Sequence, residues 1–158
     1  MDVGTRIEYF HKQHQDFLRL LGEWESAVEL AGSGDDEECV RGLARMRELQ
    51  PELKEIESHC ISEERNVESP YRKYLQAGQL ETFEKEHRDL ERLLAELFAD
   101  LRFATVHQTD RVRQAGSEIA TLARRHIQFE DKLIEEIERK LAEEAAEKIL
   151  LRYTQSPE

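Results

Sequence analysis

Apolar residues recur at alternating spacings of three and four positions in four long stretches of the chain. These stretches cover about residues 5–31, 36–68, 79–104 and 109–141. The spacing places the apolar side chains on one face of an α-helix, because the helix turns once every ~3.6 residues. In the third stretch the pattern continues without a gap through Leu80, Phe83, His87, Leu90, Leu94, Leu97 and Leu101. The pattern therefore predicts four amphipathic helices around a shared core.

Residues between the stretches predict where the helices begin and end. The segment AGSG at 31–34 ends the first helix. The acidic run DDEE at 35–38 suits the start of the second, since carboxylates are stabilised at the positive end of the helix dipole. Pro51 predicts a kink or a break within the second helix, because proline cannot donate a helical hydrogen bond. Thr109 and Asp110 are predicted to cap the fourth.

Long helices with short connections favour an up-down-up-down four-helix bundle of the all-α class. Residues 68–78 are expected to connect the second helix to the third. The tail AEEAAEKILLRY, residues 142–153, is also amphipathic and predicts a short C-terminal helix that docks on the bundle. A length of 158 residues is most simply one domain, 1–158.

The composition supports a helical fold and limits the class of partner. Charged residues make up 37% of the chain, with 7 Gly and 3 Pro. The net charge of -12 disfavours nucleic acid and anionic membranes as partners, because both would be repelled. The cysteines, Cys39 and Cys60, form no CxxC motif, and no signal peptide or membrane-spanning stretch is visible. We therefore expect a cytoplasmic protein.

Four of the 6 histidines lie on the apolar faces, one in each predicted helix: His14, His59, His87 and His126. A single histidine on such a face is more often a core residue bonded to a neighbour. Four together are harder to explain in that way, because each buried imidazole needs a partner. His87 and His126 should also lie level, each about 18 residues from the turn that joins their helices, or roughly 27 Å along the helix. A metal ion would satisfy all four converging rings.

Two of these histidines have a glutamate four residues later, as His59 with Glu63 and His126 with Glu130. Residues i and i+4 share a helix face, so each pair can bind through an imidazole and a carboxylate together. Four nitrogens and two carboxylates are more than one ion needs, and two metal ions fit better. Mixed ligands of this kind suit iron, and also zinc or manganese. Two divalent ions with two carboxylates and a bridging hydroxide would leave a net charge of only about +1.

The ordered set resembles the hemerythrin-like domains, the histidine-histidine-glutamate cation-binding proteins. The resemblance is carried by HKQHQDF with His14, HCISEE with His59 and Glu63, EKEHRDL with His87, and RRHIQFED with His126 and Glu130. It implies a non-haem di-iron centre in which the two glutamates bridge the ions together with an oxo or hydroxo group. It also implies a small ligand, either dioxygen, nitric oxide or peroxide, or else a role in sensing or storing iron.

The sequence departs from the oxygen-carrying members of that family. In their pattern the third helix carries HxxxH, whereas the fourth residue after His87 here is Glu91. Glu91 is expected to be either an oxygen-donor ligand or a solvated residue. They also end with HxxxxD, and Asp131 follows Glu130 as an outward charge or as an acceptor for a ligand histidine. His11 is expected at the solvent edge, with a bond to a ligand or a place as the fifth histidine as alternatives. These departures favour responses to iron, nitric oxide or peroxide over oxygen carriage.

Two other classes of function compete with this interpretation. A ferritin-like oxidase or peroxidase would use ExxH motifs on two helices with additional glutamates. The histidines of the second and fourth predicted helices, His59 and His126, lack that motif, so an enzyme is not favoured. A metal-free helical interaction module would require four unrelated histidines on the core faces.

Overall fold

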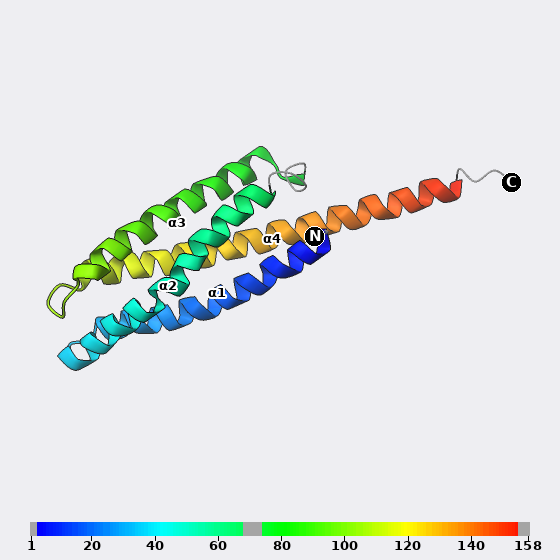
Figure 1. Ribbon diagram of the computed structural model, residues 1–158. Helices are drawn as coiled ribbons and strands as arrows, with labels where there is room; N and C mark the ends of the chain where they lie inside the picture. The colour runs from blue at the N-terminus through cyan, green and yellow to red at the C-terminus, as the bar shows by residue number, and fades with distance from the viewer. Residues whose placement is uncertain (1–2, 68–73, 155–158) are drawn as a thin grey trace.

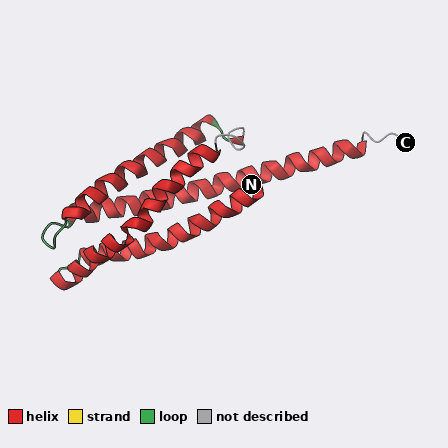
Figure 2. Ribbon diagram, viewed as in Figure 1, coloured by secondary structure: helices red, strands yellow, loops and turns green. Residues whose placement is uncertain are grey.

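The computed structural model describes the backbone of residues 3–67 and 74–154 and the side chains of residues 8–59, 62 and 74–150. Within these residues the chain forms four α-helices and no strand (Figure 2). The helices are α1 (Val3–Ala31), α2 (Asp36–Val67), α3 (Ala77–Phe103) and α4 (Asp110–Thr154).

Each helix packs against two others: α1 and α3 both contact α2 and α4. Figure 1 shows successive helices lying side by side and running in alternate directions. The predicted all-α up-down-up-down bundle is therefore confirmed. The expected connection at residues 68–78 falls largely on residues 68–73, which lie outside the described part of the chain.

The turn from α1 to α2 follows the sequence signals closely. The backbone N–H of Glu38 donates a hydrogen bond to Oδ1 of Asp35, at 2.9 Å, which satisfies a donor in the first turn of α2. One turn later, Gly42 allows the two helices to approach. A Cβ atom at this position would lie 2.3 Å from the backbone nitrogen of Ala31. Glycine therefore sets the spacing between α1 and α2 near their turn.

The structure tests two predictions about helix continuity. Of the kink or break predicted at Pro51, the break does not occur, because α2 continues through this residue, which lies on its exposed face. There, the carbonyl of residue 47 that loses its helical partner can bond to water instead. The tail at 142–153 is not a separate short helix, because α4 runs without a break to Thr154 and projects beyond the bundle (Figure 1). Ala, Glu, Lys and Leu in this stretch are strong helix formers, and no Gly or Pro is present to end the helix.

The apolar core fills the part of the bundle nearer the turn at residues 32–35. Trp24 is completely buried there, and its indole N–H donates to the carbonyl of Gly116 at 3.1 Å. Phe17 and Leu94 belong to the same cluster, as their places in the apolar pattern predict. The four histidines of the apolar faces follow this core toward the other end of the bundle.

Candidate metal centre

The four histidines of the apolar faces converge inside the bundle. Each is at most 5% exposed, and each comes from a different helix. Nε2 of His14 lies 3.2 Å from Nε2 of His59, which pairs α1 with α2. The rings of His87 and His126 lie 4.6 Å apart between their centroids, which pairs α3 with α4.

The carboxylate of Glu130 lies between the two histidine pairs. Its Oε2 is 3.0 Å from Nε2 of His14 in the first pair. Its Oε1 is 2.9 Å from Nε2 of His126 and 3.4 Å from Nε2 of His87 in the second. Glu130 is only 3% exposed. One carboxylate thus offers a separate oxygen to each pair.

Three of the rings are oriented by acceptors on their other nitrogen. Nδ1 of His14 donates to Oδ1 of Asp131 at 2.8 Å, and Nδ1 of His59 donates to Oε1 of Gln13 at 2.7 Å. Nδ1 of His126 donates to Oε2 of Glu86 at 3.0 Å. These oxygens can only accept, so each Nδ1 carries the proton. In the neutral imidazole the lone pair then lies on Nε2. This nitrogen faces Glu130 in His14 and His126, and it faces His14 in His59.

With neutral rings, this tautomer leaves the centre without positive charge. The lone pairs of His14 and His59 face each other across 3.2 Å, and the lone pair of His126 faces a carboxylate oxygen across 2.9 Å. Like-signed atoms at these distances repel each other unless protons or metal ions lie between them.

The distances fit metal ions. With metal–ligand bonds of about 2.1 Å, neighbouring donor atoms lie about 3.0 to 3.4 Å apart in octahedral or tetrahedral sites. The observed separations around Glu130 run from 2.9 to 3.4 Å. Two groups of donors within 4.8 Å of one another can each hold an ion, and both include Glu130: one with His14 and His59, the other with His87 and His126.

The charge of Glu130 suits this role. Burial alone would raise the pKa of its carboxyl group, since the low-dielectric interior disfavours the ionised form. When the ring of His126 is protonated, its charge and the hydrogen bonds from His126, His14 and His87 outweigh burial, and they hold the pKa of Glu130 well below its usual range. Glu130 is therefore a carboxylate at neutral pH, ready to bind a cation.

A family-level comparison agrees with this geometry. The family model for the hemerythrin HHE cation-binding domain matches residues 5–138, which include all of the histidines and the glutamate described above. The chain belongs to the hemerythrin HHE family. No curated protein and no solved structure matches the chain.

Aromatic rings surround the histidines of this hemerythrin domain. Phe10 and Phe17 meet the ring of His59 edge-on, with centroids 5.6 and 5.0 Å away. Phe83 lies 4.1 Å from the ring of His87, again between centroids. The three phenylalanines shield the donor atoms from water, which strengthens electrostatic interactions inside the cluster.

The structure places the other expected residues at different depths. Glu63 follows His59 by one turn in α2, but its side chain lies outside the described residues. Glu91 is half-buried and joins no group of potential ligands among the side chains described. Asp131 is 35% exposed and contacts the outer nitrogen of His14, while His11 is 37% exposed and lies 3.3 Å from the same carboxylate oxygen.

Sequence reasoning missed the acceptors Glu86 and Gln13. Each immediately precedes a histidine of the centre and bonds to a histidine of a neighbouring helix. Glu86 is 6% exposed, and its Oε1 also accepts a hydrogen bond from Nε of Arg125 at 2.8 Å. Glu86 lies three residues after Phe83, at the edge of the apolar stripe, and this position was the available signal in the sequence.

In the described residues, no helix is long and apolar enough to cross a membrane.

Proposed function

We propose that this hemerythrin HHE chain binds two iron ions in a non-haem di-iron centre. The observation that carries the proposal is the position of Glu130, whose two oxygens face two separate histidine pairs. A bridging carboxylate between two ions has this arrangement. A single ion would leave one histidine pair without a cation, in a site where all four rings are buried.

The residues divide between the two ions by helix pair. His14 and His59 would hold one ion with Oε2 of Glu130, and His87 and His126 would hold the other with Oε1. Glu63, on the same face of α2 as His59, is proposed as the second bridging carboxylate, together with an oxo or hydroxo group. Zinc or manganese could replace iron, because both accept imidazole and carboxylate ligands.

Iron in such a centre would supply a change of oxidation state and positions open to a small ligand. We propose dioxygen, nitric oxide or peroxide as that ligand, or a role in sensing or storing iron itself. Glu91 supports a response to iron, nitric oxide or peroxide rather than reversible oxygen carriage. It occupies the position at which the oxygen-carrying members of the family have a further histidine. Glu91 also lies outside the groups of donor atoms that contain Glu130.

Metal analysis of the purified protein tests the proposal. We expect about two iron ions per chain and, under air, the near-ultraviolet charge-transfer bands of an oxo-bridged pair. Anaerobic reconstitution with Fe²⁺, Zn²⁺ and Mn²⁺ in turn would establish the preferred ion. A chain that binds none of the three after reconstitution would contradict the proposal. Binding of a single ion would leave metal binding intact and overturn the two-ion arrangement.

A further inference from the structure

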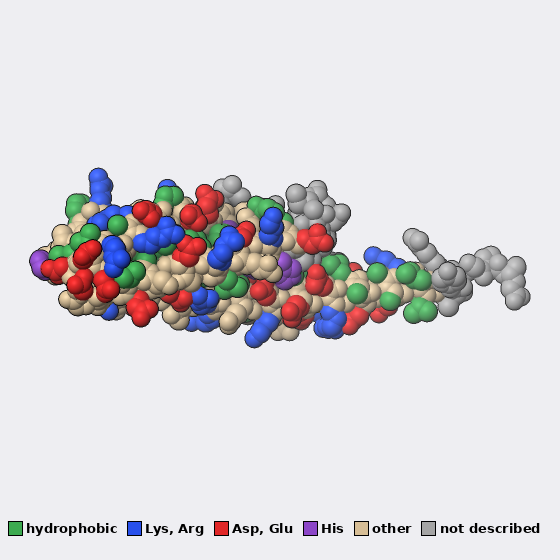
Figure 3. Space-filling view, turned by 90° about the horizontal axis from the view of Figure 1, so that it is seen from below, with side chains coloured by type: hydrophobic (Ala, Val, Ile, Leu, Met, Phe, Trp, Pro, Cys, Tyr) green, Lys and Arg blue, Asp and Glu red, His purple; other side chains and the backbone are tan. Residues whose placement is uncertain are grey.

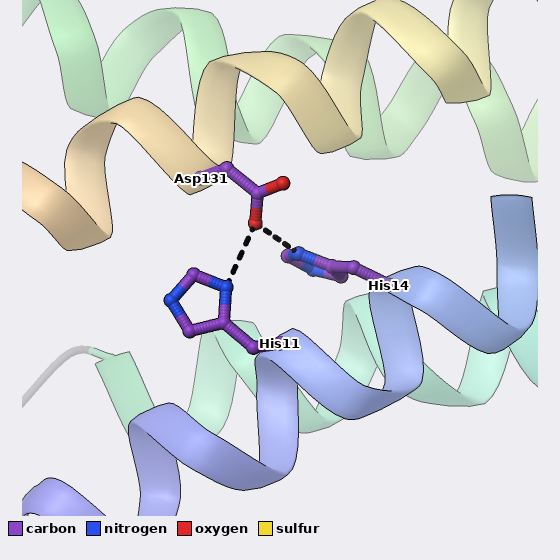
Figure 4. Close-up of side chains that lie close together, drawn as sticks. All are labelled: His11, His14 and Asp131. Atoms are coloured by element: carbon purple, nitrogen blue, oxygen red, sulfur yellow. Dashed lines mark hydrogen bonds and ion pairs between the residues drawn. The ribbon is translucent and has the colours of Figure 1, made fainter.

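A second, more exposed group of donor atoms lies beside the proposed di-iron centre. Oδ1 of Asp131 on α4 lies between two rings of α1, 3.3 Å from Nδ1 of His11 and 2.8 Å from Nδ1 of His14 (Figure 4). These donor atoms lie within 4.8 Å of one another. The inner pairs of donors do not include His11 or Asp131, so these two side chains lie outside the site proposed for the iron ions.

The group runs from the surface to the interior. The side chains of His11 and Asp131 are 37% and 35% exposed, whereas that of His14 is 2% exposed. His14 belongs to both sites, because its Nδ1 faces Asp131 and its Nε2 faces Glu130. In Figure 3 a histidine side chain reaches the surface among acidic side chains, near the point where α4 leaves the bundle.

A buried centre has a kinetic requirement that this group can meet. An ion bound by rings at most 5% exposed must lose its hydration shell before it arrives. An imidazole and a carboxylate at the surface can replace some of that water while the rest of the shell remains. The net charge of -12 also raises the local concentration of cations around the chain.

We propose that His11 and Asp131 form a capture site that binds a divalent cation before it passes to the buried centre. The ion binds Nδ1 of His11 and the carboxylate of Asp131, with water completing its coordination. His14 keeps Nε2 for the buried centre and holds Asp131 in place through Nδ1. The proposal rests on the proposed function, since the capture site has a role only if the inner residues bind metal.

Loading kinetics test the capture site. The apo form of the full chain is mixed with Co²⁺, whose visible absorption reports binding to imidazole and carboxylate ligands. We compare His11→Ala with the matched control His107→Ala, which removes an exposed histidine from the loop before α4. Loss of a site that concentrates the cation should slow loading by about tenfold in His11→Ala. The final amount of bound Co²⁺ should match wild type, and His107→Ala should load at the wild-type rate.

The outcomes separate this proposal from the function on which it rests. Loading of His11→Ala at the wild-type rate would overturn the capture site alone. A reduced final amount of Co²⁺ in His11→Ala would also overturn it, because His11 would then be a ligand of the buried centre. A wild-type chain that binds no Co²⁺ would overturn the proposed function, and the capture site with it.

A direct measurement complements the kinetics. With the buried centre already filled by Zn²⁺, added Mn²⁺ can be followed by the loss of the free-ion signal in electron paramagnetic resonance. Wild type and His107→Ala should bind one further Mn²⁺ weakly, and His11→Ala should lose this binding. Equal Mn²⁺ binding by His11→Ala and wild type would show that the extra ion lies elsewhere and would overturn the proposal.

Discussion

Glu86 of α3 accepts a buried hydrogen bond from His126 of α4, at 3.0 Å between Oε2 and Nδ1. This bond fixes the ring so that Nε2 faces Glu130. It also joins two helices at the level of the proposed metal centre. A carboxylate that supports a metal-binding histidine raises the basicity of the ring and holds its orientation.

Glu86→Ala should therefore weaken metal binding without removing a ligand. Outer partners of this kind typically change metal affinity by about 10- to 100-fold when they are removed. Competition with a chromophoric chelator measures the change. Glu84→Ala is the matched control, because Glu84 is on the same helix and its side chain is 41% exposed. Equal affinity of Glu86→Ala and wild type would show that the bond to His126 has no part in binding.

Glu130→Gln should remove the shared carboxylate while keeping its shape. We expect loss of at least one bound ion and a smaller increase in melting temperature when metal is added. A ligand that binds only the folded state stabilises it by about 2.7 kcal/mol at 100 times its Kd. Thermal unfolding followed by circular dichroism, with and without metal, measures the effect. Glu136→Gln on the same helix is the control, and full loading of Glu130→Gln would contradict the bridging role.

Gly42→Ala should destabilise the fold, whereas Gly22→Ala should not. A methyl group at Gly42 would lie 2.3 Å from the backbone nitrogen of Ala31, so α1 and α2 would have to separate. Overpacking of this kind typically costs about 1–3 kcal/mol. At Gly22 nothing lies within 4 Å, so alanine should stabilise α1 by up to about 1 kcal/mol through its better helix propensity. Urea denaturation of both variants checks this, and equal midpoints would contradict the packing at Gly42.

Glu91→His should add a fifth histidine to the four of the proposed centre, one turn after His87. If the departure at this position limits oxygen binding, the variant should form a longer-lived oxygen adduct than wild type. Absorption spectra of the Fe²⁺-loaded protein, recorded after exposure to air, measure the lifetime of the adduct. Glu81→His, at an exposed position of α3, is the control. The same lifetime in wild type and in both variants would show that residue 91 does not set the response to oxygen.

The sequence predicts the helices and the burial of the four histidines well, because both follow from helical periodicity. His59, His87 and His126 occupy apolar stripes, and burial follows directly from that position. The choice between Glu130 and Asp131 also follows from geometry. The residue four places after His126 shares its face, whereas the fifth is rotated by about 140° away from it. Asp131 accordingly turns toward α1 and the surface.

The acceptors of the outer ring nitrogens could not be predicted in the same way. Gln13 and Glu86 lie at the edges of the stripes, where polar residues normally face water. Their roles depend on the distance and rotation between helices, which one helix's periodicity does not encode. The continuity of α4 was also missed, because an amphipathic tail predicts a helix without indicating whether it is separate.

Neighbouring residues in the chain serve different histidines, and this links the chemistry to the alignment of the helices. On α1, His14 faces Glu130 while Gln13, one residue earlier, holds His59 of α2. A shift of α1 by one residue along its axis would misplace the proposed ligand His14 and, at the same time, release the ring of His59 on α2. Metal occupancy would then fall sharply for small errors in register. Bound metal could thus serve as a sensitive indicator of correct assembly, able to distinguish the native bundle from a helical but misaligned one.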